Sequence, residues 1–157
     1  MEPILISACL LGAACRYDGG SNPVLSVEAL MGRCQLVPVC PEQLGGLPTP
    51  REPAERTGGG VVTKTGADVS AQYQRGAEQA LHLARMFGCK RAVLKERSPS
   101  CGAGEIYDGT FTGARVPADG VTAQLLKANG IEVFGESEIE TLLEQLDDAQ
   151  PEEPSFF

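Results

Sequence analysis

The six cysteines are the residues of this chain best suited to carry chemistry. They are Cys9, Cys15, Cys34, Cys40, Cys89 and Cys101. A small secreted domain held by disulfides would be richer in cysteine, so we expect a reducing compartment. There the alternatives are buried apolar cysteines, metal ligands and a reactive thiolate. Because His82 is the only histidine, a metal site would consist mainly of thiolates, which favour zinc or an iron–sulfur cluster.

The spacing of the cysteines argues against a local zinc motif. The sequence contains no C-x-x-C pair, and the closest pairs, Cys9 with Cys15 and Cys34 with Cys40, are each six residues apart. Zinc fingers and ribbons need shorter spacings between paired ligands. A site assembled from distant segments stays open, and its geometry depends on the elements that carry the cysteines.

The hydrophobic pattern predicts four short strands and four helices. The strands are expected at residues 4–8, 35–39, 91–95 and 131–134, and the helices at residues 26–33, 68–87, 119–129 and 137–146. This alternation predicts an α/β fold, with a mainly parallel sheet flanked by helices in Rossmann-like layers. Pro38 inside the second strand favours an edge position. Asp68 and Ser137 are the predicted caps of the second and fourth helices.

Two stretches between these elements are predicted as loops with short strands. Residues 41–67 form a long loop rich in Gly and Pro, with a two-stranded excursion near residues 61–64 and a flexible loop or lid at residues 58–60. Residues 105–112 are predicted to form a hairpin around Asp108 and Gly109. We expect one domain, residues 1–146, followed by a flexible acidic tail, residues 147–157.

Composition and charge narrow the classes of function. The 157 residues carry a formal net charge of −8, which argues against tight binding to nucleic acids or anionic membranes but allows a small uncharged ligand. Apolar runs fall short of the ~18 residues that a membrane helix needs. The N-terminal apolar stretch begins Met-Glu-Pro and lacks the positive charge of a secretory signal. We therefore expect a cytoplasmic protein.

Three of the cysteines follow three predicted strands. Cys9 comes after the first strand, Cys40 after the second, and Cys101 lies in the loop after the third. Parallel α/β sheets bind ligands beyond the carboxyl ends of their strands, so neighbouring strands would bring these thiols together. Three thiolates suit a zinc ion with an open fourth position, or a [4Fe–4S] cluster whose free iron is a soft Lewis acid. Three buried, inert cysteines are the alternative; Cys34 and Cys89, which precede strands, are expected to be of that kind.

Three blocks of sequence resemble a known family. They are residues 7–12 (SACLLG) with 15–19 (CRYDG), residues 38–42 (PVCPE) with 45–47 (GGL) and 50–51 (PR), and residues 94–95 (LK) with 98–102 (SPSCG) and 107–111 (YDGTF). Together they are similar to a bacterial family, formerly a domain of unknown function, whose characterised member is the thiouracil desulfidase. The resemblance extends over residues 4–146.

The resemblance implies a cofactor and a reaction. The cofactor is a [4Fe–4S] cluster held by Cys9, Cys40 and Cys101. The reaction is the non-redox removal of sulfur from a small thiolated base such as 2-thiouracil, which leaves the oxo base. Cys15 lies in the same loop as Cys9 and is a fourth ligand, a thiol that receives sulfur, or neither.

Three polar residues near these cysteines are candidate catalytic groups. Glu42 follows Cys40 by two residues and is the candidate general base for water, with capping or pairing with Arg16 or Arg51 as its alternative role. Ser98 and Ser100 precede Cys101 and are candidate donors to the substrate or to the sulfides of a cluster. Turn formation is their alternative role.

Other interpretations stay open at this point. Tyr107 or Phe111 could stack on the face of a base, or belong to the core. The chain could instead be a non-catalytic zinc or iron–sulfur binding module. It could also be a metal-free cysteine enzyme for sulfur transfer or redox chemistry that uses Cys15 or Cys101.

Overall fold

A four-stranded parallel sheet forms the centre of the protein. The computed structural model describes residues 1–149. The sheet contains β1 (Pro3–Ser7), β2 (Gln35–Val39), β5 (Arg91–Leu94) and β8 (Glu132–Gly135), in the order β2-β1-β5-β8. All neighbouring pairs are parallel. The predicted α/β class is confirmed, and Pro38 lies on an edge strand as expected.

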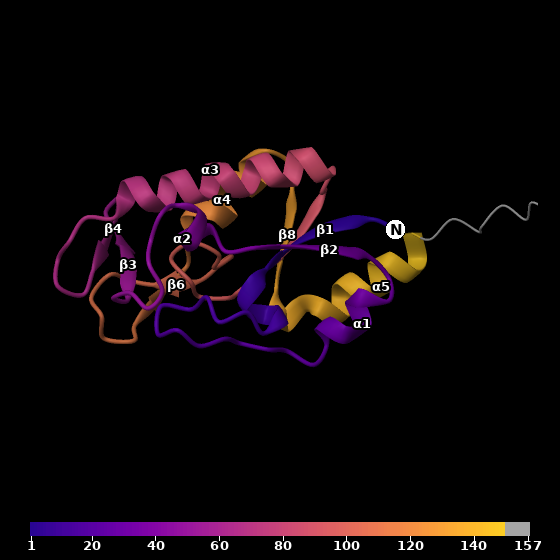
Figure 1. The fold of residues 1–157 in the computed structure, drawn as a ribbon, viewed down its shortest axis with the longest axis horizontal. Coiled ribbons are helices and arrows are strands. Elements are labelled where there is room, and N and C mark those ends of the chain that lie inside the picture. The colour runs from indigo at the N-terminus through magenta and orange to yellow at the C-terminus, as the bar shows by residue number, and fades with distance from the viewer. Residues whose placement is uncertain (150–157) are drawn as a thin grey trace, which may run out of the picture.

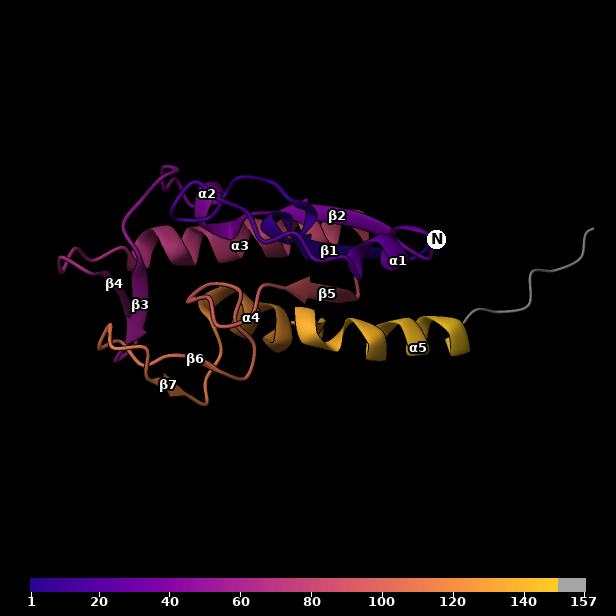
Figure 2. The same cartoon turned by 90° about the horizontal axis from the view of Figure 1, so that it is seen from below.

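Helices cover both faces of this sheet (Figures 1 and 2). On one face, α1 (Val27–Met31) and α5 (Ile139–Ala149) pack against Ile4, Ile6 and Val93. On the other face, α3 (Ser70–Phe87) and α4 (Val121–Ala128) pack against Leu5 and Leu94. Successive residues of a strand point to opposite faces, so each strand contributes to both cores. This explains why the strands read as short continuous apolar runs.

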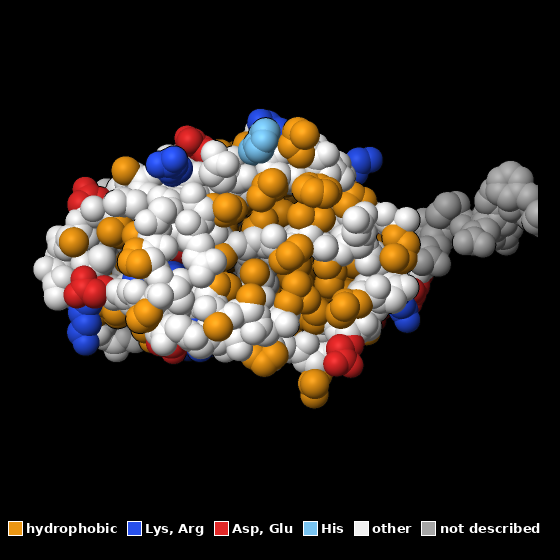
Figure 3. Space-filling model, in the orientation of Figure 1, with side chains coloured by type: hydrophobic (Ala, Val, Ile, Leu, Met, Phe, Trp, Pro, Cys, Tyr) orange, Lys and Arg blue, Asp and Glu red, His pale blue; other side chains and the backbone are white. Residues whose placement is uncertain are grey.

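Two small hairpins stand beyond the carboxyl ends of the sheet strands (Figure 1). One pairs β3 (Ala54–Thr57) with β4 (Gly60–Thr63), and the other pairs β6 (Ile106–Tyr107) with β7 (Arg115–Val116). Figure 3 shows apolar side chains gathered over the half of the molecule that holds the sheet, with fewer over the half that carries the hairpins. Among the helices of residues 1–149, none has the length and apolar character needed to cross a membrane.

The predicted loop at residues 41–67 is more ordered than expected. It begins with a one-turn helix, α2 (Pro41–Leu44), which the sequence pattern did not predict. The two strands expected near residues 61–64 form a hairpin, but only β4 lies there. Its partner strand is β3, at residues 54–57. Gly58 and Gly59 are the turn of this hairpin rather than a lid, because both have a positive φ and so match the twist of the two strands.

Other predicted boundaries also need correction. The strand β6 pairs with residues 115–116, which lie beyond the predicted hairpin at residues 105–112. The turn around Gly109 is therefore part of a longer loop between β6 and β7. Ser137 does not cap the last helix: its N–H donates to Glu96, while the Glu138 carboxylate accepts the N–H of Gly135. Asp68 accepts the N–H of Ser70, the first residue of α3.

The last helix continues beyond its predicted end. Helix α5 runs to Ala149, and Asp147 forms an ion pair with Arg33. The first residues of the predicted tail are therefore helical, and the rest of that segment, residues 150–157, lies outside the described residues. A second unpredicted element, the 3₁₀ turn η1 (Ala8–Leu11), follows β1 and carries Cys9.

Two glycines let α2 lie directly on α3. A Cβ atom at Gly45 would be 2.0 Å from the carbonyl oxygen of Gln72, and one at Gly76 would be 1.9 Å from that of Pro41. A side chain cannot be accommodated at such distances in a packed interior. The contact therefore holds the segment that carries Glu42 against the first half of α3.

We predict that Gly76→Ala destabilises the protein. In an ordinary helix interior this change stabilises by up to about 1 kcal/mol. Here it should lower the free energy of unfolding by roughly 2–3 kcal/mol, because the added methyl group forces α2 away from α3. Urea unfolding measures this change.

Gly32→Ala is the matched control for this prediction. An added Cβ at Gly32, at the end of α1, has no neighbour closer than 3.9 Å. The control should change the free energy of unfolding by less than about 0.5 kcal/mol. Equal stability of the two variants would contradict a close contact between α2 and α3.

Candidate active site

A cavity of about 510 Å³ opens at the carboxyl ends of β1, β2 and β5. One part of its lining comes from the segments that directly follow these three strands. Other lining residues come from the two hairpins and the residues beside them, including Glu55, Lys64 and Phe111, and from α3, which contributes Tyr73. This is the edge at which parallel α/β sheets bind their ligands.

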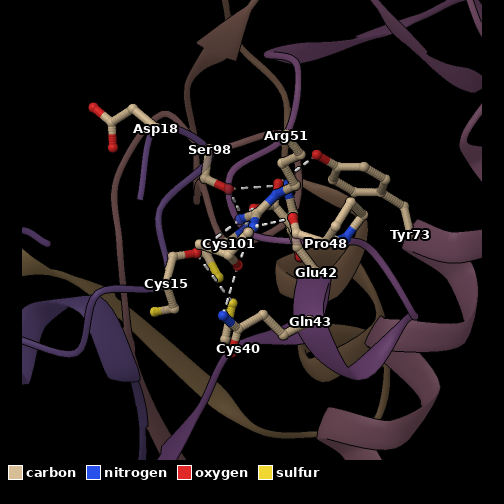
Figure 4. Close-up of polar contacts among 12 residues, drawn as sticks. Cys15, Asp18, Cys40, Glu42, Gln43, Pro48, Arg51, Tyr73, Ser98 and Cys101 are labelled. Carbon is tan, nitrogen blue, oxygen red and sulfur yellow. Dashed lines mark hydrogen bonds and ion pairs between the residues drawn. The ribbon is translucent and has the colours of Figure 1, made fainter. Parts of the chain in front are cut away.

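The three cysteines predicted to meet all line this cavity. Cys9 comes from η1, Cys40 from the residue between β2 and α2, and Cys101 from the loop after β5. Figure 4 shows the sulfur atoms of Cys40 and Cys101 turned toward the same space. Burial, then the Glu42 carboxylate and the neighbouring sulfurs, raise the pKa of Cys101, and burial raises that of Cys9. Burial thus disfavours the charged thiolate form of both cysteines.

Cys15 is a fourth thiol of the same cavity. It is 5% exposed, and its carbonyl oxygen lies 3.8 Å from the sulfur of Cys40. Burial, together with Cys40 and Cys9, raises the pKa of Cys15 to about 12. Its backbone is held in place because the same carbonyl oxygen accepts a hydrogen bond of 2.9 Å from Arg51.

Glu42 faces the cavity with both carboxylate oxygens hydrogen-bonded (Figure 4). Arg51 donates to Oε2 and forms an ion pair, and the hydroxyl of Tyr73 donates to Oε1. Burial and then the Glu42 carboxylate raise the pKa of Tyr73, so the phenol remains a donor. The side chain of Arg51 is only 6% exposed, which makes this a buried ion pair.

The two candidate serines have different positions. Ser98 lines the cavity, and its oxygen accepts the N–H groups of Ser100 and Cys101 at 3.1 and 3.0 Å. Its hydroxyl proton is therefore free to be donated. Ser100 is 1% exposed and is not part of the cavity lining; its hydroxyl is 2.7 Å from that of Thr122 on α4. The structure therefore does not bring Ser100 into the cavity with the other candidate residues.

Lys95 lines the cavity, and its positive charge is paired with the carboxylate of Glu136. Its ammonium group donates to Glu136 at 2.6 Å, and its backbone N–H donates to the hydroxyl of Ser7. Glu136 also accepts the N–H of Glu96. The end of β5 is thus tied to the ends of β1 and β8, next to Cys9.

The remaining cysteines and the histidine lie elsewhere. Cys34 and Cys89 are 2% and 6% exposed and precede β2 and β5, as expected for structural cysteines. Burial raises the pKa of Cys34 to about 11. His82 is exposed on α3 and is not among the residues that line the cavity.

Sequence reasoning did not identify Tyr73 as a functional residue. It belongs to the apolar stripe of α3, where its spacing indicates a core position. A buried tyrosine hydroxyl nevertheless needs a hydrogen-bond partner, and this was the available signal. Which acceptor it meets depends on the packing of α2 against α3.

Comparison with known proteins places this chain in a family. A profile of the 2-thiouracil desulfurase family matches residues 4–138. The chain belongs to this family. The family expected from the sequence motifs is therefore confirmed.

Two relatives extend the comparison over nearly the whole chain. The Bacillus subtilis (strain 168) protein described as "Uncharacterized protein YbbK" is 43% identical over 150 residues, which cover 89% of this chain and 99% of the relative. A solved structure described as the "[4Fe-4S]-dependent thiouracil desulfidase TudS (DUF523Vcz)" matches with a TM-score of 0.89 and 48% identity. That match covers 94% of this chain and 99% of the other.

We predict that Arg51→Met strongly destabilises the fold. The change leaves the Glu42 carboxylate, whose side chain is 16% exposed, without its cation. Leaving one partner of a buried pair uncompensated costs roughly 3–5 kcal/mol. Urea unfolding of the wild type and the variant measures the loss.

Arg33→Met provides the comparison. The side chains of Arg33 and Asp147 are 40% and 53% exposed, so loss of this surface pair should cost no more than about 1 kcal/mol. If both arginine variants lose the same amount of stability, the ion pair with Glu42 is not the buried support described above.

Proposed function

We propose that this protein removes sulfur from a small thiolated base and uses a [4Fe–4S] cluster held by Cys9, Cys40 and Cys101. The observation that carries the proposal is the convergence of these three thiols with Glu42 and Ser98 in one cavity, from segments far apart in the sequence. The likeness to a structure described as [4Fe-4S]-dependent supports the choice of cluster.

The donor set of the cavity suits an iron–sulfur cluster. The available ligands are thiols, which favour iron–sulfur centres or zinc over harder cations. Within residues 1–149, no three His, Cys, Asp or Glu side chains come close enough to share a single metal ion. A cluster does not need that arrangement, because each cysteine binds an iron of its own. We therefore favour the cluster over the alternative of a single zinc ion.

The overall reaction requires water but no electron transfer. The thiocarbonyl of the substrate and one water give the oxo base and hydrogen sulfide, so atoms balance and no group changes oxidation state. When bound with three cysteines, the cluster supplies a soft Lewis acid with affinity for the substrate sulfur. The protein must then orient the ring, activate the water and accept a proton.

Glu42 is the proposed general base. Each of its oxygens accepts one hydrogen bond, from Tyr73 or Arg51, and retains a further lone-pair direction for a water in the cavity. The two donors fix the orientation of the carboxylate. A water proton passes to a carboxylate oxygen as the water oxygen attacks the thiocarbonyl carbon.

Ser98 is the proposed hydrogen-bond donor to the substrate, the thiolated base. Its oxygen already accepts two backbone N–H groups, so the hydroxyl proton is directed away from them. A hydrogen bond from this hydroxyl to a ring nitrogen or to the forming oxygen stabilises the negative charge that develops there. Ser100 has no part in this proposal.

Anaerobic reconstitution tests the proposal as a whole. We expect a brown protein with iron–sulfur absorbance that releases sulfide from thiolated bases in a panel led by 2-thiouracil. A colourless protein with stoichiometric zinc would indicate a binding module instead. Activity of the metal-free protein with thiols would indicate a cysteine-based sulfur-transfer enzyme.

We predict that Cys9→Ser, Cys40→Ser and Cys101→Ser each lose the cluster and the activity. A hydroxyl is a much poorer ligand for iron than a thiolate. Iron content, visible absorbance and sulfide release measure the outcome. Cys34→Ser and Cys89→Ser, outside the cavity, should retain all three; a cluster retained in Cys40→Ser would remove that residue from the ligand set.

We predict that Glu42→Gln keeps the cluster but lowers kcat by roughly 10²–10⁴-fold, since the amide cannot take the proton from water. The amide oxygen can still accept from Arg51, and the amide N–H group can donate to the hydroxyl of Tyr73. Arg51 nevertheless loses its counter-charge, so thermal unfolding must first establish that the variant is folded. Turnover of 2-thiouracil at equal iron content measures the effect. An unchanged kcat would exclude Glu42 as the base.

A further inference from the structure

Phe111 is held in a strained backbone conformation at the wall of the cavity. It lines the cavity and has a φ of +58°, in the left-handed region that bulky side chains rarely adopt. Phe111 belongs to none of the three apolar cores formed by the described residues. Its conformation is thus not explained by core packing, and strain of this kind gathers at functional sites.

Glu55 holds the backbone of Phe111 in this conformation. The carboxylate oxygen Oε1 of Glu55 accepts the N–H groups of both Gly109 and Phe111, at 3.0 and 3.1 Å. Glu55 comes from β3 and is only 8% exposed, yet none of the ion pairs among residues 1–149 includes it. A buried carboxylate is costly, and here it serves to fix one loop.

The loop is also locked by close packing. A Cβ atom at Gly109, whose φ is +95°, would lie 2.8 Å from Cβ of Thr57 and 2.9 Å from the carbonyl oxygen of Arg56. Asp108 accepts from both the backbone N–H and the hydroxyl of Thr110. The loop between β6 and β7 is therefore held against β3, and it places Phe111 in the lining of the cavity.

We propose that Phe111 is a specificity-determining residue that stacks on the planar face of a heteroaromatic ring in the cavity, and that Glu55 is the positioning residue that sets the ring of Phe111. The identity of the ring as a thiolated base rests on the proposed function. Stacking suits this wall because it recognises the planar face of a base without requiring a charge. The polar groups of the cavity are then left to recognise the edge of the base.

The test compares the binding of a planar ligand with that of a puckered analogue. Uracil and 5,6-dihydrouracil have the same polar edge, but only uracil has a flat aromatic face. Neither contains sulfur, so their dissociation constants can be measured by calorimetry on the reconstituted protein without turnover. The wild type should bind uracil roughly 10-fold more tightly than dihydrouracil, the effect expected of one stacking contact.

Variants of Phe111 separate stacking from support of the fold. Phe111→Leu should abolish the preference for uracil and raise KM for 2-thiouracil about 10-fold, with kcat changed much less. Phe111→Tyr keeps an aromatic ring and should keep the preference. Phe87→Leu, at the exposed end of α3, is the control and should leave both values unchanged. Iron content and thermal unfolding confirm that each variant is folded and loaded.

Variants of Glu55 test whether it acts through Phe111. Glu55→Ala should reduce the preference for uracil. Glu55→Gln should keep the wild-type preference, because the amide oxygen accepts the same N–H groups. In a Phe111→Leu background, Glu55→Ala should have no further effect on the two dissociation constants. An equal effect in both backgrounds would overturn the positioning role.

The outcomes distinguish this inference from the proposed function. Desulfidase activity together with an unchanged preference for uracil in Phe111→Leu overturns the stacking role alone. A ring preference that depends on Phe111, without sulfide release from 2-thiouracil, supports stacking and overturns the proposed reaction. A wild-type protein that binds neither uracil nor dihydrouracil overturns the inference.

Discussion

The charged groups that line the buried cavity must be paired, and this requirement constrains the arrangement of the segments around it. Where water screens poorly, a negative group needs a compensating charge or hydrogen-bond donors nearby. Arg51 supplies it for Glu42, and Glu136 balances Lys95. The thiols are not balanced in this way, and burial raises the pKa of Cys9. These thiols are the proposed ligands of the cluster, which would take the place of their protons.

The scaffold positions these groups through rigid elements. Three adjacent parallel strands end at the same edge, and the residues that follow them reach the cavity directly. The backbone contact at Gly45 and Gly76 presses α2 onto α3, which brings Tyr73 to Glu42. The two hairpins complete the wall, and the carboxylate of Glu55 joins one hairpin to the other. A small planar ligand would therefore meet a largely preformed site.

The regular elements of the fold were predictable because their signals are local. Apolar runs mark the strands, and helical periodicity marks α3 and α4. The single turn of α2 was missed because so short a helix has little stability of its own and depends on its contact with α3. The loop around Gly109 was predicted to be shorter than it is. Its conformation depends on a hydrogen bond to the carboxylate of Glu55 on β3, which no local sequence pattern indicates.

The sequence by itself determined the α/β class, the family motifs and the placement of Cys9, Cys40 and Cys101 after three strands. Only the tertiary structure decided the surroundings of each functional group. It put Arg51 and Tyr73 on Glu42, turned Ser100 away toward Thr122, and fixed Phe111 through Glu55. Tyr73 is 31 residues from Glu42, and Phe111 is 56 residues from Glu55. Contacts of that range depend on how whole elements pack, and no local pattern of residue types encodes them.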